Sequence, residues 1–170
     1  IVCAGRRVVA VDMTQARVEI MAEDVWSRAY EAVGVTTGGM KGELLCVALQ
    51  CARKGLVAVF DGSKKWLTSE LGFVPRLVIG LETPCFAISD ESQTLILNRG
   101  LKPVARIHGK ALTSIGPRGL LLVQETECTW WSIASAAAPV PLRTYVMPAD
   151  VKAATTCGTE LWFIADGKVT

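Results

Sequence analysis

The chain has 170 residues, of which 51% are hydrophobic and 20% are charged, and its formal net charge is +2. A chain this apolar can bury a core and is not disordered, and so small a charge gives no basic footprint for nucleic acid as a direct ligand. No apolar run approaches the roughly 18 residues of a membrane span, so we expect no membrane-spanning segment.

Short apolar runs between glycines and prolines recur along the chain and predict β-strands. The first stretch of this kind begins at Cys3. Next, Met21–Val33 has apolar residues at helical spacing, and it predicts one short helix near residues 23–33, with Gly34 as its stop. We expect Val35–Gly39 to be a loop, whereas the alternation within Leu44–Ala52 favours a strand.

Four later stretches share the form of the first: a segment of small residues, a break, an apolar run, a turn and another strand. They begin at Cys51, Ser89, Ile115 and Thr156. Between the last two, Ala134–Pro141 contains small residues and two prolines, which predicts a linker or a long surface loop. The sequence therefore predicts an all-β chain of about five hairpin units with one short helix.

The five stretches align without gaps at a shared turn position, which is occupied by Thr14, Gly62, Gly100, Thr126 and Gly167. The strong tight-turn pair Asp-Gly occurs in two copies, as Asp61-Gly62 and Asp166-Gly167. Apolar residues lie five and three positions before each turn, as Val9 and Val11, Val57 and Val59, Leu95 and Leu97, Leu121 and Val123, and Trp162 and Ile164. We interpret each pair as core residues on one buried strand face.

The turn positions are 48, 38, 26 and 41 residues apart. A propeller blade takes roughly 40–50 residues, and three of the spacings fit this length approximately. The short interval between Gly100 and Thr126 indicates one of two arrangements. Either that blade lacks its outer strand, or the two stretches are successive hairpins of another all-β fold.

The segments Val47–Thr68, Ile88–Gly100 and Val151–Val169 resemble blades of β-propellers, most closely those of the chromosome-condensation-regulator and tectonin types. The resemblance implies a β-propeller or a propeller fragment, with residues 1–170 as one domain that is incomplete or part of a longer chain. Such families typically act as platforms for protein interaction. Some members regulate small GTPases, and some tectonin-like members bind carbohydrate.

The sequence offers little catalytic or metal-binding chemistry. Its six cysteines include no C-x-x-C pair, and no cysteine lies near the single histidine, His108. We therefore expect no zinc site, and we interpret the cysteines as buried thiols in a reducing, intracellular and cytoplasmic setting. The stretch Gly34–Lys41 does not match phosphate-loop spacing, and we interpret Asp61, Asp166 and Glu125 as turn residues. No catalytic residue and no cofactor is predicted.

The tryptophans are the best candidates for contact with a partner, because tryptophan is enriched at interface hot spots. Trp130 and Trp131 are adjacent, so on a strand they face opposite sides, and one of them needs cover from a neighbouring element or a partner. We predict Trp130, Trp131 and Trp66 as interface residues. The expected function is a non-catalytic scaffold for protein interaction within a multi-subunit assembly. The alternatives are a carbohydrate-binding propeller that uses Trp131 and a regulator of a small GTPase.

Overall fold

The computed structural model describes residues 2–4, 7–12, 17–19, 31–51, 54–61, 66–83, 85–133, 138–147, 151–157, 160–165 and 168–169. Within these ranges the chain forms antiparallel β-sheets joined by turns and contains no helix. The prediction of an all-β protein is therefore confirmed.

Every sheet is made of strands that follow one another along the chain. The first sheet contains β1 (Val2–Ala4), β2 (Arg7–Asp12) and β3 (Arg17–Glu19). The second contains β4 (Glu31–Gly38), β5 (Leu44–Cys51), β6 (Lys54–Phe60) and β7 (Trp66–Leu71). The third contains β8 (Leu77–Gly80), β9 (Cys85–Ser89), β10 (Gln93–Asn98) and β11 (Pro103–His108). The fourth contains β12 (Lys110–Ser114), β13 (Gly119–Gln124), β14 (Glu127–Ser132) and β15 (Val140–Val146), and the fifth contains β16 (Val151–Cys157), β17 (Glu160–Ala165) and β18 (Lys168–Val169).

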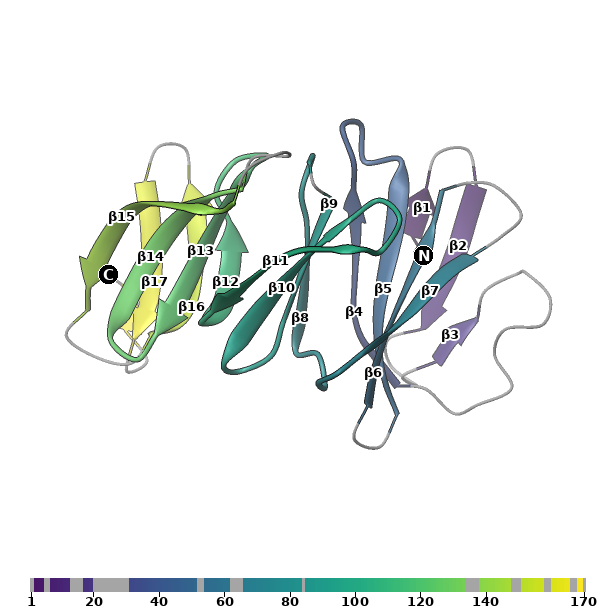
Figure 1. Cartoon of the computed structure of the whole chain (residues 1–170), viewed down its shortest axis with the longest axis horizontal. Helices are drawn as coiled ribbons and strands as arrows, with labels where there is room; N and C mark the ends of the chain where they lie inside the picture. The colour runs from purple at the N-terminus through teal and green to yellow at the C-terminus, as the bar shows by residue number, and fades with distance from the viewer. Residues whose placement is uncertain are drawn as a thin grey trace.

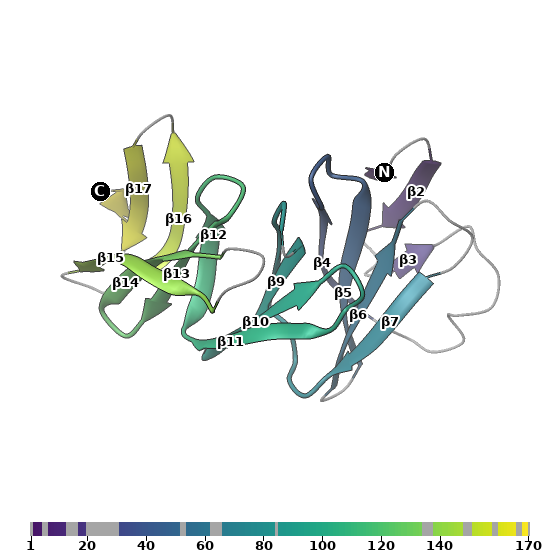
Figure 2. The same cartoon turned by 45° about the horizontal axis from the view of Figure 1, so that its top comes forward.

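The sheets stand one after another in a row, with the first and last sheets at opposite ends (Figure 1). The first strands of the last four sheets are neighbours, because β4 contacts β8, β8 contacts β12 and β12 contacts β16. Figure 2 shows the same order of sheets from another side. The sheets therefore meet face to face, along one line of first strands.

Burial on both faces explains why the middle strands are continuous apolar runs. In β10, Leu95 and Leu97 belong to a core cluster shared with β4–β7, whereas Ile96 belongs to a cluster shared with β12–β14. In β13, Leu120 and Leu122 face the third sheet, and Leu121 packs with Phe163 of the fifth. A strand with one solvent-exposed face would alternate apolar and polar residues. These strands are buried on both faces, so their residues do not alternate.

Small residues permit the first strands to approach one another closely. A Cβ atom added to Gly80 of β8 would overlap the carbonyl oxygen of Thr37 in β4, and the Gly80 N–H donates a hydrogen bond to Thr36 Oγ1 at 3.0 Å. A Cβ at Gly34 would lie 3.0 Å from Val78 Cγ1. Larger side chains here would therefore separate the second and third sheets.

A single glycine joins the third sheet to the fourth. Gly109 lies between β11 and β12 with φ of 113°, and its N–H donates to the Ser92 carbonyl at 2.8 Å. Two buried hydroxyl groups secure this link: Thr94 Oγ1 donates to the Gly109 carbonyl at 2.8 Å, and Ser89 Oγ accepts from the Ala111 N–H at 2.9 Å. The buried polar groups at the crossing are thus hydrogen-bonded, as close packing of two sheets requires.

Several local predictions are corrected by the strand boundaries. Residues 23–30 of the predicted helix lie outside the described residues, but Glu31–Val33 begins β4, so the helix prediction is wrong there. Val35–Gly38 also belongs to β4 and is not a loop, since this small-residue stretch pairs with β5. Val140 and Pro141 belong to β15, so the predicted linker does not extend to them. The strand predicted at Leu44–Ala52 is confirmed over Leu44–Cys51 as β5, and Ala52 lies outside the described residues.

The gap-free alignment is out of phase in its second half. The aligned runs of the second and third copies are β6 and β10, which are the third strands of their sheets, whereas those of the fourth and fifth copies are β13 and β17, which are second strands. The change from third strands to second strands accounts for the short interval of 26 residues between the turn positions Gly100 and Thr126. The idea that a blade lacks its outer strand is wrong, because β8–β11 is a complete four-stranded sheet.

The close approach of β4 and β8 predicts a large effect of one methyl group. We expect Gly80→Ala to lower the free energy of unfolding by about 2 kcal/mol, because the added Cβ must displace the backbone of β4. Gly72→Ala is the matched control, since a Cβ there has no neighbour within 4 Å. Urea unfolding of both variants gives the comparison, and equal stability of the two variants would contradict the packing described.

Candidate functional site

The two adjacent tryptophans of β14 face opposite sides of the fourth sheet, as predicted. Trp131 packs on the core cluster toward the third sheet, and Trp130 packs on the cluster toward the fifth. Both rings are half-buried, and Trp130 Nε1 is a buried donor with no hydrogen-bond partner in the described part of the chain. Neighbouring sheets therefore cover these rings. Trp66 begins β7, and its side chain lies outside the described residues.

The exposed large apolar side chains lie elsewhere: Met40, Leu67, Val104, Val140, Leu142, Val146, Trp162 and Ile164. The last two are on β17, on the face opposite Phe163, and are 38% and 42% exposed. Their interpretation as a core pair is wrong, whereas Leu121 and Val123, at the aligned positions of β13, are buried. Among the described residues, those of other sheets pack on one face of the fifth sheet only.

We call this uncovered surface of the fifth sheet the outer face. Strand register places Ala153 opposite Ile164 and Thr155 opposite Trp162, and both partners are exposed. Residues directly opposite in an antiparallel pair share a face. The outer face therefore presents two large apolar side chains beside small, uncharged ones, and the exposed Glu160 lies on the same face of β17, two residues before Trp162.

The outermost strands of the third and fourth sheets are poor templates for pairing with another strand. β11 begins with Pro103, next to a register shift in its pairing with β10. β15 contains Pro141 and Arg143, and its pairing with β14 shifts register between Trp130 and Trp131. Proline, charge and bulges on edge strands hinder addition of a further strand. Contact with other proteins is thus favoured at faces and loops over these edges.

A cleft of 570 Å³ lies where three loops meet at one end of the second and third sheets. Its lining comes from the β4–β5 loop (39–43), the β8–β9 loop (81–84), the β10–β11 loop (99–102) and the start of β11. We call it the loop-end cleft. The cleft was not predicted from the sequence, because its loops are far apart in the chain. The one local indication of it is an apolar residue among glycines, in the run Gly38-Gly39-Met40-Lys41-Gly42.

Hydrogen bonds fix the loops around the loop-end cleft. The Gly39 N–H donates to the Leu81 carbonyl at 2.9 Å, which ties the β4–β5 loop to the β8–β9 loop. In the β10–β11 loop, Asn98 Oδ1 accepts from the N–H groups of Gly100 and Lys102 at 2.9 and 3.0 Å. Leu101 has φ of 60° and is 5% exposed, so a buried side chain anchors that loop in a strained conformation.

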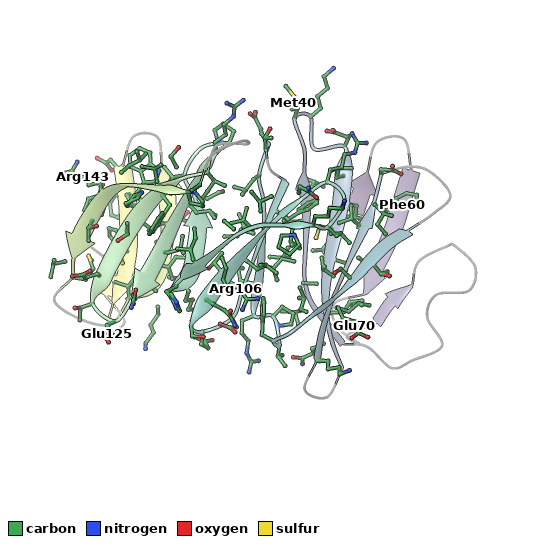
Figure 3. All side chains as sticks on the ribbon, viewed as in Figure 1. Met40, Phe60, Glu70, Arg106, Glu125 and Arg143 are labelled. Carbon is green, nitrogen blue, oxygen red and sulfur yellow. The ribbon has the colours of Figure 1, made fainter. Side chains whose placement is uncertain are left out.

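A second hollow, of 420 Å³, lies at the opposite end of the sheets and includes His108, Lys110 and Glu91. Figure 3 shows its lining residue Glu125 at the end of the molecule away from Met40. His108 is exposed at the end of β11, just before Gly109, and Lys110 Nζ donates to Glu91 Oε2 at 2.8 Å. The adjacent turn is ordered by Asp90, whose Oδ1 accepts from the N–H groups of Ser92 and Gln93.

The described residues contain no group of three or more histidine, cysteine, aspartate and glutamate side chains that could hold a metal ion. Cys46 and Cys128 are buried, and neither is in a disulfide. Burial raises the pKa of the Cys128 thiol to about 11, which keeps it protonated and unreactive at neutral pH. In the part of the chain that the structure describes, no helix could cross a membrane.

No protein-family model matches the chain, and no curated protein matches its sequence.

The Asp90 turn gives a pH prediction. Burial alone would raise the pKa of Asp90, but hydrogen bonds from Gln93 and Ser92 outweigh it and hold this pKa below its usual value. The ionised carboxylate therefore stabilises the fold above the unfolded-state pKa, and this stabilisation is lost as the pH falls through the folded-state pKa. We expect Asp90→Asn to lower the free energy of unfolding by about 1 kcal/mol at neutral pH.

Urea unfolding at neutral and strongly acidic pH tests this prediction, because the difference between Asp90→Asn and the parent should shrink in acid. Glu125→Gln, which removes an exposed carboxylate from the β13–β14 turn, is the control and should change stability by less than about 0.5 kcal/mol. A difference that stays constant with pH would show that the charge of Asp90 plays no part.

Proposed function

We propose that the chain is a non-catalytic scaffold for protein interaction, a subunit of a larger assembly whose sheets act as propeller-like blades. The support is the architecture: four-stranded sheets of consecutive strands, packed face to face with their first strands adjacent. β-Propellers are assembled from four-stranded blades in this manner. The proposed blades form a rigid support that presents faces and loops to other proteins.

The observation that carries the proposal is the outer face. Leu121 and Val123 on β13 are covered by the fifth sheet, whereas Trp162 and Ile164 on β17 have no such cover. Large apolar side chains that are exposed together on a sheet surface are typical of an interface. We infer that the occupant is another antiparallel sheet with an apolar face, because a sheet covers the corresponding surface of the fourth sheet.

A second copy of the chain is the simplest partner to test. The exposed Trp162 and Ile164 of one copy can pack on those of another, and we expect reversible association that strengthens with protein concentration. Burying a large apolar side chain contributes roughly 1.5–3 kcal/mol. Trp162→Ser combined with Ile164→Thr should therefore weaken the association by at least about tenfold.

Sedimentation equilibrium measures this dissociation constant. The matched control combines Leu67→Ser with Val140→Thr, which alters two exposed apolar residues on β7 and β15, away from the outer face. The control should associate like the parent. A parent chain that stays monomeric, or equal weakening in the two double variants, would count against the outer face as an interface.

A further inference from the structure

The loop-end cleft presents apolar surface that the core does not use. Met40 is 71% exposed at the tip of the β4–β5 loop, and Figure 3 shows it directed away from the sheets. Val104 of β11, 40% exposed, lines the same cleft. The hydrogen bond from the Gly39 N–H to the Leu81 carbonyl holds the loop that carries Met40 beside the β8–β9 loop. Methionine adapts to varied apolar partners, which suits a binding surface.

The β4–β5 loop requires its glycines, which indicates a specific conformation. Gly39 and Gly42 have φ of 88° and 64°, in the left-handed region that favours glycine. A Cβ at Gly39 would also lie 2.8 Å from the carboxylate of Glu43. The loop therefore holds one shape before any partner binds, so little conformational entropy is lost on binding.

The positive charges around the cleft exceed the negative ones. Arg99 and Lys102 line it and are exposed, and Lys41 lies in the same loop as Met40. The two carboxylates of the cleft have contacts of their own. Glu43 Oε2 accepts from the Lys41 N–H at 2.9 Å, and Glu82 lies 3.8 Å from Arg118.

Arg99 and Lys102 are in none of the ion pairs found among the described residues. The hydrogen bond from the Lys41 N–H, with a smaller contribution from the charge of Arg99, lowers the pKa of Glu43. Both cationic side chains thus remain accessible to an acidic ligand, on a loop held in place by Asn98 and Leu101.

We propose that the loop-end cleft binds a short, extended acidic segment of a partner protein. An apolar side chain of that segment contacts Met40 and Val104, and its carboxylates pair with Arg99 and Lys102. The volume of 570 Å³ lies within the range of ligand pockets and suits a few side chains. Complementary charge fixes the orientation of the segment, while apolar contact supplies affinity.

This inference goes beyond the scaffold proposal and concerns another surface. The outer face lies on the fifth sheet, whereas the cleft lies between the second and third sheets. The variant with Trp162→Ser and Ile164→Thr leaves the cleft intact, so failure of one proposal is distinguishable from failure of the other.

Fluorescence anisotropy with three labelled peptides tests the inference. The acidic probe is EDLFDE, the charge-reversed probe is KKLFKK, and DESGDE keeps the acids but has no large apolar residue. We expect the full chain to bind EDLFDE at least about tenfold more tightly than either of the others. Added salt should weaken the binding, because accessible charges are screened.

Two variants with matched controls locate the binding site. Arg99→Glu should weaken EDLFDE binding by about tenfold or more. Arg76→Glu is its control, because it makes the same charge change on an exposed arginine at the end of β8 away from the cleft. Met40→Ser should weaken it by a similar factor, with Leu67→Ser as the control for an exposed apolar residue. All four positions are exposed, so the unfolding midpoints should stay unchanged.

Three results would overturn the inference. They are no saturable binding of EDLFDE to the parent chain, equal weakening by Arg99→Glu and Arg76→Glu, and tighter binding of a labelled oligothymidylate than of EDLFDE. The last result would assign the cleft to nucleic acid instead. Selective loss in Arg99→Glu and Met40→Ser, with both controls unchanged, would support a peptide-binding cleft.

Discussion

Face-to-face packing of neighbouring sheets determines which residue types each strand can contain. The first strands can touch only where the backbone is nearly bare, as at Gly80 against Thr36 and Thr37. The strands that follow carry apolar residues on both sides, as β10 and β13 do, because each side meets another sheet. Two buried polar side chains, Ser89 and Thr94, lie at the link through Gly109 and are hydrogen-bonded there.

The same packing limits where the molecule can meet others. The interior faces are occupied, and the outer strands β11 and β15 carry prolines and register shifts that hinder strand addition. Two kinds of surface remain. One is the outer face of the fifth sheet, which exposes Trp162 and Ile164; the other is the loop-end cleft, whose lining includes both cations and carboxylates. The proposed scaffold would thus combine a flat contact with a selective one.

The sequence predicted the strands well and their phase poorly, for a physical reason. Runs such as Leu120–Val123 identify a buried strand, but burial on both faces removes the alternation that would show which residue faces which sheet. The turns gave no fixed reference either, because β10 and β11 are joined by four residues and β13 and β14 by two. Trp162 and Ile164 were therefore assigned to the core, since nothing local shows that their sheet lacks a neighbour on that side. The cleft depends on three distant loops, and only the glycines around Met40 hinted at it.

The most direct test of the stacked architecture is the contact between β4 and β8, which joins the second sheet to the third. Gly34 and Val78 are 44 residues apart in the chain, and a Cβ on Gly34 would lie 3.0 Å from Val78 Cγ1. A carbon-edited nuclear Overhauser spectrum of the labelled chain measures this proximity. If β4 and β8 pack as described, we expect a strong cross-peak between the Gly34 α-protons and the Val78 γ1-methyl group. Its absence, with Val78 showing contacts only to residues of β9, would contradict the packing of these sheets.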